Sequence, residues 1–262
     1  ASEFSQAHKF LYDMSSAYSI PPSSLILCPG NHDMEYSKEE YKDDDEVVLT
    51  YNEAKANYID FYEKTRQTRS NEFNNSIQRF ISVNGQLIEI ISLNTCILQQ
   101  DRQHFRGMGY VGINQLDVIK KELKNTQRMN TTRILVMHHH LLPVAFSEKP
   151  QINPMYSMLL DSESIIQFCI SNNITIVLHG HTHQNYYSEI LRPFEKTKRK
   201  IAIIGLGSTG AIRDDLTDGY NNQFATLIFE SKRICIKVYE IMSNGNNLDD
   251  KPITEYTIEY GE

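Results

Sequence analysis

Histidines are the side chains of this sequence best suited to do chemistry, and most of the nine gather in three short segments. These segments are 30–33, 138–140 and 179–183, and each directly follows a short apolar run typical of a buried strand. Ligands of α/β sheets bind at the carboxyl ends of strands, where loops from separate strands meet. Imidazole is a common ligand of zinc, iron, manganese and nickel. The three segments therefore predict a single metal site.

The spacing inside the third segment strengthens this prediction. His181 and His183 are two residues apart, so an extended backbone would point both imidazoles to the same side. Gly180 lets the main chain approach an ion closely or turn sharply. One H-x-H pattern is commonly a packing feature, whereas three histidine segments at strand ends favour a functional site. We expect His179 and the outer members of the 138–140 triplet to be bystanders.

The elements that must position these segments follow from hydrophobic periodicity. Apolar residues recur at helical spacing in 3–18, 51–65, 114–123 and 162–171. Strand patterns lie at 24–28, 77–83, 86–93, 133–137, 174–178, 186–191, 200–206, 224–230, 234–241 and 253–260. The Asn84-Gly85 pair predicts a hairpin between the second and third of these strands. Helices alternate with strands early and strands dominate late, which predicts one α/β domain over residues 1–262, with two packed sheets under outer helices.

Composition limits the classes of function. With 40% hydrophobic and 23% charged residues the composition is that of an ordinary globular protein, and the net charge of −7 disfavours broad electrostatic binding of nucleic acid. No apolar run approaches the roughly 18 residues of a membrane span. The four cysteines form no C-x-x-C pair, so we expect buried, reduced thiols in a cytoplasmic protein. The acidic run 43–46 and the pair Asp214-Asp215 are expected to be solvated loops.

Three motifs carry a family resemblance. G-N-H-D at 30–33, the paired histidines at 138–139 and G-H-T-H at 180–183 resemble, in that order, the later motifs of the calcineurin-like metallophosphoesterase superfamily. The G-x-x-Q-L pattern at 112–116 and the G-x-G-S pattern at 205–208 are similar to those of its bacterial phosphodiesterase-like branch. The resemblance runs through nearly the whole chain. It implies a four-layer α/β/β/α fold, in which two sheets are sandwiched between helices and a dinuclear metal centre lies at the strand ends.

The resemblance also implies a set of metal ligands, namely Asn31, His139, His181 and His183. Asn31 and His181 resemble ligands of the second metal, and His183 resembles a ligand of the first. His138 is the alternative to His139, because Leu141 stands where family members have a proline after their ligand. The implied cofactors are two divalent cations in the complete domain, with manganese, iron, zinc and nickel all compatible with these ligand types.

Catalytic roles follow from the same resemblance. His32 resembles the histidine that contacts the phosphoryl oxygens and assists the leaving group, and Asp33 would orient its imidazole. The implied reaction is attack on phosphorus by a metal-bound hydroxide between two cations about 3.5–4 Å apart. General acid–base help of the kind expected from His32 is typically worth ~10²–10⁴-fold in rate.

Two motifs of the family pattern do not occur in this sequence. The pattern opens with D-x-H and G-D, and neither is found. We therefore expect the N-terminal portion of the domain to be missing and the chain to be part of a longer one. By itself it should bind at most one metal, weakly, and hydrolyse phosphoesters little or not at all. Residues 34–76, with their predicted helix, form an expected insertion that caps the site or packs against a neighbour.

The leading functional prediction is a hydrolase of small phosphomonoesters or phosphodiesters, such as nucleotides. A non-catalytic or regulatory module within a larger assembly is the alternative from a different class. Retention of His32 and Asp33 argues against that alternative, because a pure scaffold has no use for a leaving-group acid. A nuclease is a further alternative, but it requires a basic groove that Arg102, Arg106 and Arg213 could only begin to provide.

Overall fold

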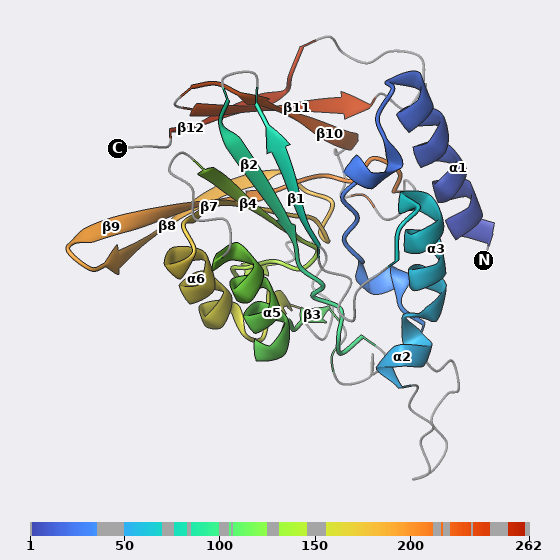
Figure 1. The fold of residues 1–262 in the computed structure, drawn as a ribbon, viewed down its shortest axis with the longest axis horizontal. Helices are drawn as coiled ribbons and strands as arrows, with labels where there is room; N and C mark the ends of the chain where they lie inside the picture. The colour runs from blue at the N-terminus through green and yellow to red at the C-terminus, as the bar shows by residue number, and fades with distance from the viewer. Residues whose placement is uncertain are drawn as a thin grey trace.

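The computed structural model describes most of the chain. The described residues are 2–35, 50–69, 76–82, 85–99, 105, 107–124, 131–145, 156–211, 216, 221–231, 233–241 and 251–259. Several residues named above lie outside them, namely the run 43–46, Asn84, Arg102, Arg106, Arg213, Asp214 and Asp215. Figure 1 shows two sheets stacked face to face, with helices below the larger sheet and beside the pair.

The larger sheet has six strands in the order β1-β2-β4-β7-β9-β8. Their bounds are β1 Ser76–Ile81, β2 Leu87–Ser92, β4 Thr131–Met137, β7 Ile174–His179, β9 Thr197–Gly205 and β8 Tyr186–Phe194. The four central strands, β2, β4, β7 and β9, run parallel, so their carboxyl ends share one edge. The outer strands β1 and β8 are antiparallel to their neighbours. The β1–β2 pairing confirms the predicted hairpin.

The second sheet is an antiparallel meander of β10 (Asn222–Phe229), β11 (Arg233–Ile241) and β12 (Thr254–Glu259). Its inward side chains, such as Ile234 and Ile258, pack against Ile176 and other residues of the larger sheet in a shared apolar core. A small third sheet combines β3 (Met108–Gly109), β6 (Tyr156–Leu159) and β5 (Val144–Ala145).

Helices cover the opposite face of the larger sheet. Helices α5 (Ile113–Lys124) and α6 (Ser162–Ser171) bury their apolar sides against it in the main core. Helices α1 (Ser2–Ala17), α2 (Tyr51–Ala54) and α3 (Ala56–Arg66) lie beside the sheets (Figure 1), and the ring of Phe4 stacks on that of Phe61 at 5.1 Å. These layers confirm the mixed α/β class with packed sheets flanked by helices. Among the helices of the described segments, none is long and apolar enough to cross a membrane.

A buried ionic group ties the first strands of the larger sheet together. The carboxylate of Glu89 on β2 is fully buried and accepts hydrogen bonds from Arg79 on β1 (2.9 Å) and Arg133 on β4 (2.7 Å). Arg133 also donates to the carbonyl of Asn172 at 2.7 Å. Two cations and a carbonyl therefore satisfy groups whose burial would otherwise be costly.

The strand predicted at 24–28 is wrong. The described chain forms a 3-10 turn, η1 (Pro22–Ser24), and then continues extended without joining a sheet. Both edges of β2 are already paired, with β1 and β4, so this segment has no ladder to enter there. It is held by single contacts instead, since the Ser92 hydroxyl donates to Leu27 O at 3.1 Å and the Cys28 thiol donates to Leu93 O at 2.9 Å.

Candidate metal centre

Three loops meet at the carboxyl edge of the larger sheet. Strands β4 and β7 are parallel neighbours with Met137 opposite His179, so the loops that follow them leave the sheet side by side. The backbone N–H of Gly180 donates to His138 O at 3.2 Å and joins these two loops directly. The third loop is the 3-10 turn η2 (Asn31–Asp33), which follows the extended segment.

The polar side chains of these loops converge. His138 Nε2 lies 2.8 Å from Asn31 Oδ1 and 3.0 Å from His181 Nδ1. His139 joins them, because ligand atoms of the three histidines all lie within 4.8 Å of one another. Ligand atoms 2.0–2.1 Å from a tetrahedral cation lie about 3.3 Å apart. The donor atoms around His138 therefore have nearly the separation that one cation requires.

His139 provides a second indication that the residues fit a cation. Its side chain is fully buried, and its Nδ1 atom lies 2.8 Å from the Thr95 hydroxyl. Within the described part of the chain its Nε2 atom has no hydrogen-bond partner. A buried polar atom left unsatisfied costs about 1–3 kcal/mol, which a bound cation would relieve. The second ring nitrogen of a metal-binding histidine is usually held by a hydrogen-bond partner, and here the Thr95 hydroxyl is in that place.

The electrostatics keep these imidazoles neutral. Burial is the largest cause, and it holds the pKa values of His138 and His139 well below the ordinary value. Repulsion from neighbouring imidazoles acts in the same direction, and His32 is among those that act on His138. A neutral imidazole has a free lone pair, which is the form that binds metal.

The G-N-H-D turn is closed by its own acid. The Gly30 N–H donates to Asp33 Oδ2 at 2.8 Å, while burial raises the pKa of the Asp33 carboxyl. A Cβ at Gly30 would lie 3.0 Å from the His138 ring, so the absence of a side chain lets the turn approach that ring. His32 is exposed to solvent, next to the buried Asn31.

The backbone of the G-H-T-H segment differs from the extended conformation expected for it. His181 and His183 have φ values of +81° and +56°, in the left-handed region. Such conformations cost a residue with a side chain roughly 1–2 kcal/mol and cluster at functional sites. His181 enters the three-histidine group, whereas His183 is half-buried and is not part of that group among the described residues.

Sequence reasoning missed three residues that shape the site. Thr95 follows β2 and holds His139, so the rule of polar residues after a buried strand could have found it. Gly109 of β3 lies so close that a Cβ there would be 2.7 Å from the His139 ring. Tyr186, the first residue of β8, is hydrogen-bonded to His140 and His179, which therefore are not isolated bystanders. No pattern in the sequence marks Gly109 or Tyr186.

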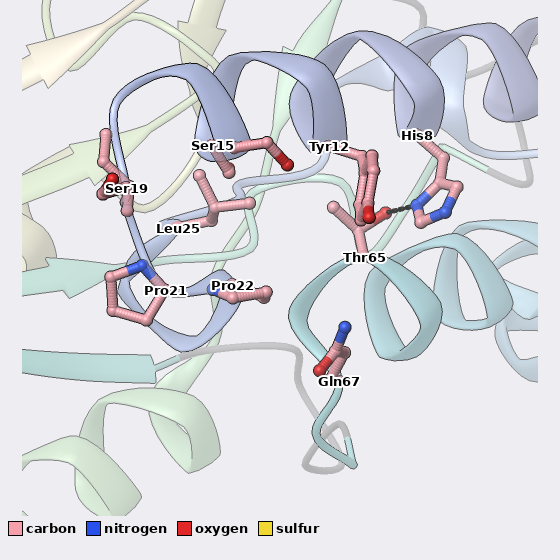
Figure 2. A pocket seen from close by; sticks show the side chains of 11 residues that line it. His8, Tyr12, Ser15, Ser19, Pro21, Pro22, Leu25, Thr65 and Gln67 are labelled. Atoms are coloured by element: carbon pink, nitrogen blue, oxygen red, sulfur yellow. Dashed lines mark hydrogen bonds between the residues drawn. The ribbon is translucent and has the colours of Figure 1, made fainter.

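A cavity of about 440 Å³ lies elsewhere, between α1, the turn before η1 and the end of α3. Figure 2 shows its lining of hydroxyl-bearing, proline and other side chains, with His8 hydrogen-bonded to Thr65. It shares no lining residue with the histidine cluster. The three-histidine group therefore lies at the strand ends and not in this cavity.

Comparison with known proteins identifies the family of this chain. The sequence model of the calcineurin-like phosphoesterase family matches residues 2–185, and the chain belongs to this family. No curated protein matches the sequence. Among solved structures, a single mutant of Vps29 from Entamoeba histolytica is 14% identical, with 57% of this chain and 77% of that chain covered and a TM-score of 0.23. Vacuolar protein sorting 29 from Cryptosporidium parvum is 16% identical, with 55% and 76% covered and a TM-score of 0.25.

Proposed function

We propose that this chain is a metal-dependent hydrolase of phosphomonoesters or phosphodiesters, acting on nucleotides or other small phosphoesters. The observation that carries the proposal is the convergence of Asn31 Oδ1, His138 Nε2 and His181 Nδ1 at the carboxyl edge of the sheet. Membership of the calcineurin-like phosphoesterase family supports hydrolysis of a phosphoester as the reaction class.

The proposed cation ligands are Asn31, His138, His139 and His181. His138 contacts two of the other donors, Asn31 and His181. His139 offers its buried Nε2 atom, while the Nδ1 atom of the same ring is held by the Thr95 hydroxyl. His183, two residues beyond His181, is proposed to serve the other cation of the complete domain, the first metal of the family pattern. The described donors of the cation held by Asn31, His138, His139 and His181 are all neutral, so we expect this cation to be bound weakly.

His32 and Asp33 have separate proposed roles beside the cation. A bound divalent cation supplies Lewis-acid polarisation of the phosphoryl group and acidification of water. His32 is exposed beside Asn31, where it can donate a proton to the leaving oxygen or a hydrogen bond to a phosphoryl oxygen. Asp33 accepts the Gly30 N–H and so keeps the turn that carries both residues closed.

A non-catalytic module is the second candidate function. It is favoured by one observation, that no carboxylate of the described residues joins the three-histidine group. A neutral donor set holds dications weakly, so a module would bind one cation and recognise a phosphate group without turnover. Hydrolysis separates the two candidates, because only the enzyme converts substrate.

The test combines metal titration with an assay of bis(p-nitrophenyl) phosphate and p-nitrophenyl phosphate in Mn²⁺. We expect one weakly bound Mn²⁺ per chain, slow hydrolysis, and loss of both in His181→Ala. His8→Ala is the matched control, because His8 lies on α1 with its ring bonded to Thr65. Manganese binding without turnover would favour the module. Hydrolysis that survives His181→Ala would refute the proposed site.

A further inference from the structure

A second group of rings lies directly behind the proposed ligands and has no part in the function described above. The Tyr186 hydroxyl lies between two imidazoles, 3.0 Å from His140 Nδ1 and hydrogen-bonded to His179 Nε2. The His140 and Tyr186 rings are stacked, with 5.7 Å between centroids and 8° between planes. The His140 ring is also 6.0 Å from that of the ligand His181.

The hydrogen bonds of this group determine which ring nitrogen of each histidine carries the proton. His179 Nδ1 lies 3.3 Å from the Gly180 carbonyl, which can only accept, so Nδ1 carries the proton. His179 Nε2 then accepts from the Tyr186 hydroxyl, because a neutral imidazole has a single N–H. The Tyr186 oxygen in turn accepts from His140 Nδ1–H. Both histidines are thereby assigned the tautomer protonated at Nδ1.

The group spans the two loops that carry the ligands. His140 lies two residues after His138 in the loop that follows β4, and His179 lies two residues before His181 at the end of β7. One hydroxyl therefore links both loops through side chains. The Tyr186 ring is held against β9, where a Cβ at Gly205 would come within 2.5 Å of it, so only glycine leaves room for the ring.

We infer that Tyr186 is a positioning residue whose hydroxyl sets the separation of the two ligand-bearing loops. This inference rests on the proposed function, since its consequence is the placement of His138 and His181 around a cation. Partners that orient metal ligands without touching the metal typically contribute 10–100-fold to metal affinity. A hydroxyl that fixes a loop on each side of the site should have an effect of that size.

The first experiment compares two tyrosines on the same strand. Tyr186→Phe removes the bridging hydroxyl, and we expect the Kd for Mn²⁺, measured by titration calorimetry, to rise roughly 10–100-fold. Tyr187→Phe is the control, because its hydroxyl donates to the exposed Glu189 and its ring stacks on Tyr256. Its Kd should match that of the wild type. Equal affinities of wild type and Tyr186→Phe would overturn the inference.

The second experiment reads the tautomers without metal. Long-range ¹H–¹⁵N spectra of the wild-type chain in a chelator should show His140 and His179 protonated at Nδ1, and Tyr186→Phe should move the ring signals of His138 and His181. Protonation at Nε2 in the wild type would contradict the assignment. His179→Gln is a milder variant for both measurements if Tyr186→Phe unfolds. A wild-type chain that binds no Mn²⁺ refutes the proposed function and the positioning role with it, while the spectra still decide the tautomers.

Discussion

At the residue scale, the site depends on imidazoles that folding keeps neutral. Burial, with repulsion from His179 and His181, lowers the pKa of His140 to about 2. Burial also lowers the pKa of His179 to about 4, against a smaller opposing effect of its hydrogen bond to Gly180. Neutral rings are needed both for metal binding and for the Tyr186 bridge, so both require a pH at which these histidines are not protonated.

The lowered pKa values predict that the free energy of unfolding decreases in mild acid. Between about pH 6.5 and pH 4 the unfolded chain binds protons at His140 and His179 that the folded chain does not bind, so unfolding becomes more favourable as pH falls. The metal-free chain should have a lower urea midpoint at pH 5 than at pH 7.5. Asp33, with its raised pKa, acts in the opposite sense, so it reduces this dependence. His179→Gln should show a shallower dependence, and a wild-type midpoint that does not change with pH would contradict the account.

Residue patterns predicted the candidate metal ligands better than the residues that hold the ligand-bearing loops in place. Asn31, His139 and His181 were predicted as ligands, with His138 as the alternative to His139, and the structure places side chains of these four residues near one another. His183 was predicted with them, but it is not part of the three-histidine group of the described residues. Tyr186 was expected only as a strand residue, since a tyrosine that begins a strand is ordinary in sequence. Its role depends on the loops that a sheet of non-consecutive strands places next to it, which no local pattern encodes.

At the scale of elements, two short strands pack against the loop that carries the histidine triplet. Strand β3 pairs with β6, whose Leu159 N–H donates to His140 O at 3.0 Å, so the small third sheet supports the triplet loop. Gly109 of β3 lies against His139. These two-residue and four-residue strands were not predicted, because so few residues show no periodicity. The segment 24–28 shows the opposite error, since an apolar run was read as a strand although its neighbour's edges are occupied.

A glycine substitution tests this packing. Gly109→Ala places a Cβ 2.7 Å from the His139 ring, so strand or ring must move. Overpacking of this kind typically costs about 1–3 kcal/mol in the free energy of unfolding, and we also expect weaker Mn²⁺ binding. Gly210→Ala is the control, because a Cβ there meets no atom within 4 Å. Equal urea midpoints and equal Mn²⁺ affinities for the two variants would show that β3 does not position His139.

At the scale of the whole molecule, the alternation of helices and strands was sufficient to predict the α/β class and the packed sheets. The four predicted helices occur as α1, α2 with α3, α5 and α6, with a break at Lys55 that divides the second. The parallel order of the central strands places loops distant in sequence at one edge. The fold thereby brings together side chains of the proposed ligand set that are more than a hundred positions apart in the sequence, such as Asn31 and His138.

The central claim is that a cation lies among Asn31, His138, His139 and His181. Anomalous diffraction from crystals of the chain grown with Mn²⁺ tests it most directly, because it locates the ion independently of activity. We expect one strong peak within about 2.0–2.3 Å of Asn31 Oδ1, His138 Nε2 and His181 Nδ1. A saturated crystal with no peak among these atoms, or with its strongest peak at other side chains, would contradict it.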